Sequence, residues 1–195
     1  EIDGKDVFYI NADDNYKGLI HKGKLAVKHG FMMLSPGHKG FKADQLPQYL
    51  EKMIKAGEVS GKIFILDTVK KFTDLMSKDK ASKFGESIRR FISHGGTVIM
   101  LAHVNKWRDE NGKVVCSGTT DLVDDVDCAY TIDVLIEEGG LRTVKFENFK
   151  SRGDVSRQAF YRYDCEDGTP YYARLESVEE VNTDDIDVRE IDELL

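Results

Sequence analysis

The stretch KIFILDTVKKF, residues 62–72, decides the fold of this chain. Its apolar run predicts a buried strand, and Asp67 stands directly at the end of that strand. The residues that follow repeat apolar positions at helical spacing, which predicts an amphipathic helix ended by a pair of glycines. The next stretch, GGTVIMLAHVNK at residues 95–106, predicts another strand, and His103 closes it. Strand, helix and strand in this order are the repeating unit of a parallel α/β sheet.

The same alternation extends toward the N-terminus and then changes toward the C-terminus. Apolar runs at residues 7–10 and 31–34 predict two further strands, and amphipathic segments at 16–29 and 46–54 predict the helices that follow them. After a predicted polar loop at 104–118, the remaining segments predict strands without helices between them: 128–136, 141–149, 158–163 and 171–175. The sequence therefore predicts an α/β fold with a mainly parallel sheet that is extended by antiparallel C-terminal strands.

The composition is that of a globular protein. Of the 195 residues, 41% are hydrophobic and 32% are charged, which excludes a disordered chain. No apolar run approaches the roughly 20 residues that a membrane span needs, so we expect no membrane partner. The cysteines Cys116, Cys128 and Cys165 form no CxxC pair, which argues against a disulfide framework or a thiolate zinc site and favours a reducing, cytoplasmic location.

The net charge of −7 is concentrated at the C-terminus. Residues 176–195 hold nine acidic side chains and one arginine, so they carry −8 while residues 1–175 carry +1. We interpret residues 1–175 as one core domain and 176–195 as an acidic tail, which is either a solvated terminus or a short amphipathic helix that docks on another protein. Because Glu1 leads within a few residues into an apolar strand, we expect the chain to begin inside a larger protein.

Polar residues stand at the ends of three predicted strands. They are Asp13 with Asp14, Asp67 with Thr68, and His103. In a parallel sheet, ligands bind outside the carboxyl ends of the strands, which makes these residues candidates for a site. Each also has a purely structural interpretation, because strand-end aspartates commonly cap the next helix and a strand-end histidine can bond a backbone carbonyl.

The order of these pieces resembles the RecA-like P-loop ATPases, of AAA type, and most closely the RepA- and DnaB-type hexameric replicative helicases. In that branch the Walker B strand ends in Asp-Thr, and the next strand ends in a His or Gln that senses the γ-phosphate. The resemblance implies a RecA-like three-layer sandwich with ATP and Mg²⁺ as cofactors. It also implies that Asp67 is the Mg²⁺-associated carboxylate, that Thr68 binds the cofactor and that His103 is the sensor.

Two further stretches extend the resemblance. YINADD at residues 9–14 resembles the strand that ends in a catalytic glutamate, and Asp13 stands there with one methylene fewer. FENFKSRG at 146–153 resembles the K-x-R turn whose basic residues reach the γ-phosphate in the neighbouring subunit. The resemblance thus implies catalytic roles for Asp13, His103, Lys150 and Arg152 in a ring-shaped homo-oligomer. A hairpin turn with solvated basic residues is the alternative explanation, but the position of Lys150 and Arg152 after the sensor strand favours the functional one.

The segment after His103 is a candidate nucleic-acid interface. At the matching place the helicases carry a loop that faces the DNA channel, and here the loop contains Lys106, Trp107, Arg108 and Lys113. Basic residues with one aromatic ring suit single-stranded DNA, because the charges meet phosphates and the ring stacks on a base. An exposed β-hairpin around residues 111–112 accounts for the same residues without DNA. Single-stranded DNA, further copies of the chain and replication proteins are the expected partners.

These ATPases need a phosphate-binding loop, and the chain offers only a near match in GLIHKGKL at residues 18–25. Leu25 replaces the required Ser or Thr, and the apolar residues inside the segment suit a helix. The motif order therefore implies a loop upstream of Glu1, and we expect the chain alone to be inactive. The leading hypothesis is an ATPase core of a RepA- or DnaB-like DNA helicase. The alternatives are a non-catalytic RecA-like DNA-binding or assembly module and, from the resemblance of residues 11–46 to primases, a Toprim domain.

Overall fold

The computed structural model describes residues 2–108, 110, 114–116 and 120–182. The chain divides into two compact units, and each is described here by itself. The first comprises Glu1–Asn105 and Cys116–Asp125, and the second comprises Lys106–Val115 and Val126–Leu195. All of the predicted strand–helix alternation falls in the first unit.

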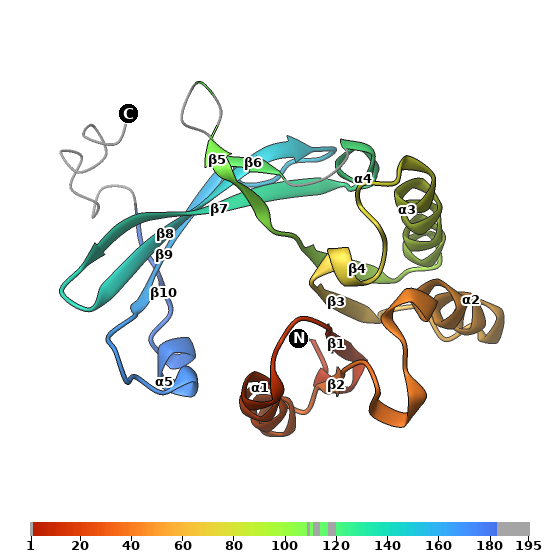
Figure 1. Ribbon diagram of the computed structural model, residues 1–195, viewed down its shortest axis with the longest axis horizontal. Coiled ribbons are helices and arrows are strands. Elements are labelled where there is room, and N and C mark those ends of the chain that lie inside the picture. The colour runs from red at the N-terminus through yellow and green to blue at the C-terminus, as the bar shows by residue number, and fades with distance from the viewer. Residues whose placement is uncertain (1, 109, 111–113, 117–119, 183–195) are drawn as a thin grey trace. The chain divides into compact units, whose positions relative to one another are not determined.

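A four-stranded parallel sheet forms the centre of the first unit (Figure 1). Its strands are β1 (Val7–Asn11), β2 (Met32–Leu34), β3 (Ile63–Asp67) and β4 (Thr97–Leu101), in the order β2-β1-β3-β4. The register aligns the last residues of three strands, since Asn11 pairs with Asp67 and Asp67 pairs with Leu101. The strands predicted at 7–10, 31–34, 63–67 and 97–102 are thereby confirmed, as is the α/β class.

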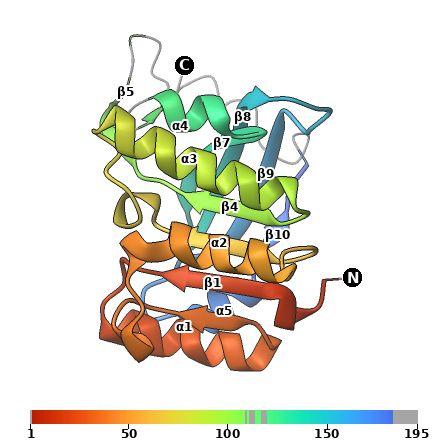
Figure 2. The same ribbon diagram turned by 90° about the vertical axis from the view of Figure 1, so that its right-hand side faces the viewer.

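Helices cover both faces of this sheet. The chain passes from β1 outward to β2 and then back across β1 to β3, so right-handed crossovers put α1 (Tyr16–His29) on one face and α2 (Leu46–Ala56) on the other. Figure 2 shows α2 beside α3 (Lys78–Ser93), with which it packs. The short α4 (Thr120–Asp125) packs on α3 through the ion pair of Arg89 with Asp125, at 2.6 Å. Single 3₁₀ turns lie at Gly4–Asp6, His38–Gly40, Ala43–Gln45 and Val69–Lys71.

The hydrophobic core of the first unit lies between the sheet and the pair α2 and α3. Alternate side chains of the strands point to this face, so that Phe8 stacks on Phe64 with ring centroids 4.8 Å apart. Phe64 in turn meets Phe91 of α3 edge to face at 5.1 Å. The largest completely buried apolar side chains of this core are Ile10, Leu46, Leu50, Val59, Leu66, Val69 and Phe91. The sheet is therefore anchored from the helix side, and the carboxyl ends of its strands are held in fixed positions.

The second unit is built on an antiparallel sheet of order β10-β9-β8-β7. Its strands are β7 (Cys128–Glu138), β8 (Leu141–Ser151), β9 (Gln158–Asp164) and β10 (Glu179–Glu180). Gly139 and Gly140 both have positive φ and form the tight turn between β7 and β8. Phe160 and Val181 are buried, and the partly buried Leu135 and Ile136 pack against them.

Three parts of the sequence-based fold are wrong. The antiparallel strands do not extend the parallel sheet, because they form a separate sheet in the second unit. The predicted strand at 171–175 is a helix, α5 (Tyr171–Glu176): Pro170 sets its first turn, and Ala173 and Leu175 favour helix over the strand preference of the two tyrosines. The predicted polar loop at 104–118 contains two paired strands, β5 (Val104–Arg108) and β6 (Val114–Cys116).

Candidate active site at the strand ends

The ends of β1, β3 and β4 bring three of the predicted site residues to one edge of the sheet. The Ala12 amide donates to the Asp67 carbonyl at 2.6 Å, which joins the chain leaving β1 to the end of β3. His103, two residues beyond β4, places Nε2 3.2 Å from Asp13 Oδ2. Because the strands are parallel and in register, residues that are distant in sequence lie at the same edge of the sheet, where ligands of parallel sheets usually bind. We call Asp13, Asp67 and His103, together with the side chains that contact them, the strand-end cluster.

Asp13 lies among cations. Lys71 Nζ is 3.1 Å from Asp13 Oδ1, and Lys70 Nζ is 4.0 Å from Asp13 Oδ2. The hydrogen bond from Lys71, followed by the one with His103, holds the pKa of Asp13 below its usual value. A carboxylate with a lowered pKa stays ionised at neutral pH but is a weak base. Its chemistry is therefore better suited to orienting a water molecule than to removing its proton outright.

Asp67 is held by three donors that all reach the same oxygen. Asp67 Oδ2 accepts a short hydrogen bond from the Tyr9 phenol and further bonds from Asn11 Nδ2 and Lys22 Nζ, both at 3.2 Å. No side chain in the described part of the chain hydrogen-bonds Oδ1. The carboxylate thus has one oxygen committed to the protein and one that can face a ligand.

Thr68 serves the fold rather than an open site in this structure. Its side chain is buried, and Oγ1 donates to the Leu101 carbonyl at 2.8 Å. This bond ties the end of β3 to the end of β4 and so fixes the distance between Asp67 and the segment that carries His103. The predicted cofactor-binding role of Thr68 stays a prediction.

Lys22 is the most important residue that the sequence did not indicate. Its ammonium lies 2.8 Å from Asp14 Oδ2 and 3.2 Å from Asp67 Oδ2, and its side chain is only 20% exposed. Burial, the largest single effect, lowers the pKa of Lys22, but hydrogen bonds to Asp14, Tyr9 and Asp67 outweigh it and raise the pKa overall. Lys22 is therefore a permanent cation inside the cluster.

Asn11 organises the turn after β1 and was also missed. It is almost completely buried, and its Oδ1 accepts from the backbone amides of Asp13 and Asp14 at 3.3 and 3.0 Å. Its amide nitrogen donates to Asp14 Oδ2 and to the Tyr9 phenol, each at 3.0 Å. An asparagine at a strand end is a known turn former, so the residue type gave a signal for the turn but not for its contacts with β3.

The contribution of the Tyr9 phenol to the stability of the protein is expected to depend on pH. Burial, with the hydrogen bond to Asp67, raises the pKa of Tyr9 to about 12, against the lowering effect of Lys22 and Asn11. The unfolded phenol ionises near pH 10 and the folded one near 12, so its stabilisation is complete below pH 10 and is lost as pH rises to 12. We expect the stability difference between wild type and Tyr9→Phe to shrink by about 1 kcal/mol over this range, allowing for the half-exposed ring. Urea unfolding at pH 9, 10.5 and 12 measures it, and a constant difference contradicts the assignment.

The near match to a phosphate-binding loop is helical, as predicted. Residues 18–25 lie inside α1, whose N-cap is Asn15 with its side chain accepting from the Gly18 amide at 3.0 Å. Neither Asp13 nor Asp14 is the helix cap, so the capping interpretation of these aspartates is wrong. The two carboxylates also face different partners, Lys71 and His103 for Asp13 and Lys22 for Asp14, an arrangement that does not favour the shared metal pair of a Toprim site.

The other predicted residues belong to the second unit. Lys150 lies near the end of β8, opposite Ala129, and Arg152 follows the strand. The Arg152 amide donates to the Asp127 carbonyl at 2.8 Å, and its guanidinium lies 3.8 Å from the Asp127 carboxylate. Lys106, Trp107 and Arg108 fall on β5 with side chains outside the described part, and Lys113 lies outside the described residues. The roles predicted for all of these residues stay predictions.

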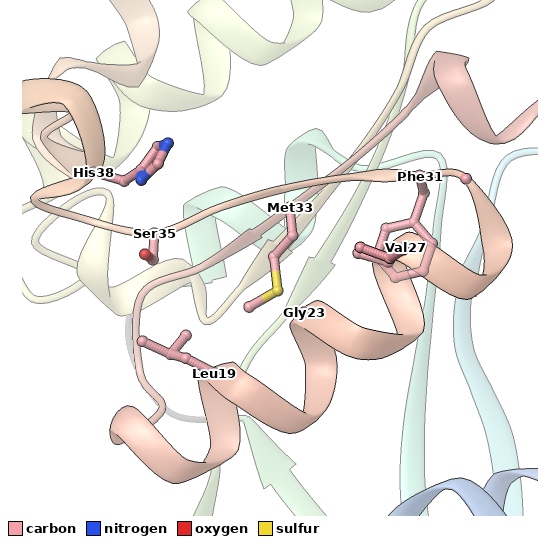
Figure 3. A pocket seen from close by; sticks show the side chains of 9 residues that line it. Leu19, Gly23, Val27, Phe31, Met33, Ser35 and His38 are labelled. Carbon is pink, nitrogen blue, oxygen red and sulfur yellow. The ribbon is translucent and has the colours of Figure 1, made fainter.

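A separate groove of about 470 Å³ lies between α1 and β2 (Figure 3). Leu19, Val27, Phe31 and Met33 give it apolar walls, and Ser35 and His38 stand at one end. None of the carboxylates or lysines of the strand-end cluster lines it. The groove therefore adds no catalytic group to the site.

The strand-end cluster fits Mg²⁺ only together with other ligands. In the described ranges no three His, Cys, Asp or Glu side chains gather as a metal site. The nearest carboxylate pair, Asp14 and Asp67, already shares the ammonium of Lys22. Asp67 Oδ1 can still face a hydrated Mg²⁺ whose remaining ligands are nucleotide phosphates. A divalent cation by itself does not fit.

No protein-family model and no curated protein matches this chain. Within the residues that the structure describes, none of the helices has both the length and the apolar content that a bilayer crossing requires. The site described above therefore stands on its own geometry.

Proposed function

We propose that this chain is the ATPase core of a RepA- or DnaB-like DNA helicase, with a RecA-like three-layer arrangement in the complete protein. The observation that carries the proposal is the contact of Asp13 with His103 beside Asp67, at the carboxyl edge of the parallel sheet. The strand order also supports it: among the described strands β4 is an edge strand, and Ile99 and Leu101 on it are 47% and 40% exposed. That edge can accept the strand that would precede a phosphate-binding loop.

In the proposed mechanism the position of each residue at the end of its strand determines its role toward the nucleotide. Asp67 would hold the magnesium of a bound nucleotide, and Asp13 orients the attacking water. His103 couples the γ-phosphate to Asp13, because its Nε2 already contacts that carboxylate. Lys150 and Arg152 act on the nucleotide of a neighbouring subunit, where the planar guanidinium suits spreading phosphoryl charge. Mg²⁺ supplies charge neutralisation when it is bound with the nucleotide.

The segment from Lys106 to Lys113 is proposed to contact single-stranded DNA in the assembled ring. Its support is the composition of residues 106–113 and the pairing of β5 with β6, which makes a two-stranded element of the kind that can reach into a channel. In the cytoplasm, replication proteins are the expected further partners. The acidic residues after Asn182 lie outside the described residues, so their role stays a prediction.

The test is DNA-stimulated ATP hydrolysis by the complete gene product, including whatever precedes Glu1. We expect Asp67→Ala and Arg152→Ala each to lower turnover at least about tenfold, because both act on transition-state charge. Asp79→Ala is the matched control, because this exposed carboxylate pairs with Lys83 on the outside of α3 at 3.0 Å, away from the strand ends. Wild-type turnover in both site variants would overturn the proposal and favour the non-catalytic DNA-binding or assembly module.

A further inference from the structure

The ammonium of Lys22 stands in the middle of the strand-end cluster. It contacts the carboxylates of Asp14 and Asp67 through their Oδ2 atoms and donates a third bond to the Tyr9 phenol oxygen at 2.9 Å. The three side chains are between 19% and 31% exposed, so the contacts are shielded from bulk water. Helix α1 fixes this arrangement, since Lys22 lies on the face of α1 that carries Leu19 and the buried Ala26.

This position is the one that a divalent cation would need in order to bind both carboxylates. The pair carries two negative charges and Lys22 carries one positive charge, which leaves a net −1. A metal ion approaching the pair meets a fixed positive charge within a few ångströms, and the repulsion is large because screening is weak at a mostly buried site. An ammonium that contributes three donors also satisfies the oxygens that metal coordination would use.

We propose that Lys22 is a built-in counter-ion that keeps free divalent cations out of the strand-end site, so that the metal ion enters only as its nucleotide complex. The part of this inference that concerns the nucleotide complex rests on the proposed function. Its electrostatic part is a property of α1, β1 and β3 and can be measured without nucleotide. The oxygen of Asp67 that Lys22 does not contact, Oδ1, is left for the incoming complex.

The experiment measures Mn²⁺ binding to the 195-residue chain in the absence of nucleotide, by the loss of the free-Mn²⁺ electron paramagnetic resonance signal. We expect Lys22→Met to bind Mn²⁺ at least about tenfold more tightly than wild type, and Lys22→Arg to behave as wild type because it keeps the charge. Lys24→Met is the matched control, since Lys24 is an exposed lysine two positions along the same helix. Adding Asp67→Asn to Lys22→Met is expected to abolish the gain.

Equal Mn²⁺ affinity of folded Lys22→Met and wild type overturns the inference, as does an equal gain in Lys24→Met. If Lys22→Met does not fold, Lys22→Gln replaces it, because its amide can still bond the carboxylates without the charge. A gain in Mn²⁺ affinity in a protein whose complete form never binds ATP would overturn the proposed function while supporting the counter-ion role. The two failures are therefore distinguishable.

Discussion

Replacing Asp13 with asparagine is expected to lower ATP hydrolysis by the complete gene product at least about 100-fold while changing its affinity for ATP by no more than about threefold. Asparagine preserves the size of the side chain but removes the charge that orients a water molecule. It also loses the ion pairs with Lys71 and Lys70 and weakens the bond to His103. A loss confined to turnover is what an interaction made with the attacking water predicts, and steady-state kinetics with a separate binding titration measure it.

A second substitution at position 13, which retains the negative charge, tests whether the charge causes the loss of turnover. Asp13→Glu keeps the charge and adds one methylene, as in the catalytic glutamate of the proposed helicase family, and we expect it to keep turnover within about tenfold of wild type. Asp79→Asn removes an exposed carboxylate from α3 and is expected to leave ATP turnover unchanged. If Asp13→Asn hydrolyses ATP as fast as wild type, Asp13 is a structural partner of His103 and Lys71 and has no role toward water.

The largest expected loss of stability comes from Phe91→Ala. Phe91 is fully buried, meets Phe64 edge to face at 5.1 Å and supports the ring stack of Phe64 on Phe8. A methyl group added at Gly96 would lie 2.2 Å from Phe91 Cε1, so the ring is packed against the backbone on its other side as well. Because neither the sheet nor Gly96 can move into the space, we expect a loss of about 3–5 kcal/mol in the free energy of unfolding of the first unit.

Urea unfolding followed by circular dichroism measures this loss. The matched control is Ile92→Ala, the next residue of α3, whose side chain is 36% exposed and for which we expect a loss of about 1 kcal/mol or less. Phe91→Leu keeps most of the volume and is expected to lie between the two. Equal losses for Phe91→Ala and Ile92→Ala would contradict the described core.

The first unit was largely predictable because its signals are local. Short apolar runs mark β1 and β3, and parallel strands in register align their ends, so the placement of Asp13, Asp67 and His103 at one edge of the sheet could be expected from the sequence. The direction of the strands alone places these polar residues at one edge, so side-chain packing need not be known. For the same reason the helical nature of residues 18–25 could be recognised from Leu19 and Ile20.

Lys22 could not be predicted because its role depends on a tertiary contact. It is separated from Asp67 by 45 residues in the sequence, and only the packing of α1 against the parallel sheet directs this one of several lysines toward Asp67. Lys71 was missed for a similar reason, since basic residues after a strand usually face solvent and here a 3₁₀ turn, Val69–Lys71, directs one back to Asp13. The second unit shows the other limit: alternation reveals strands such as β8, but it does not reveal with which sheet they pair.

The central claim is that one active site uses Asp67 of one subunit and Arg152 of its neighbour, and a subunit-mixing experiment tests it most directly. Asp67→Ala and Arg152→Ala variants of the complete gene product, each with turnover lowered at least about tenfold, are mixed in equal amounts, allowed to exchange subunits and assayed for DNA-stimulated ATP hydrolysis. In a head-to-tail ring, random mixing pairs an intact Asp67 with an intact Arg152 at about a quarter of the interfaces, so we expect about a quarter of wild-type turnover. A mixture that exchanges subunits and is no more active than either variant alone would contradict the claim.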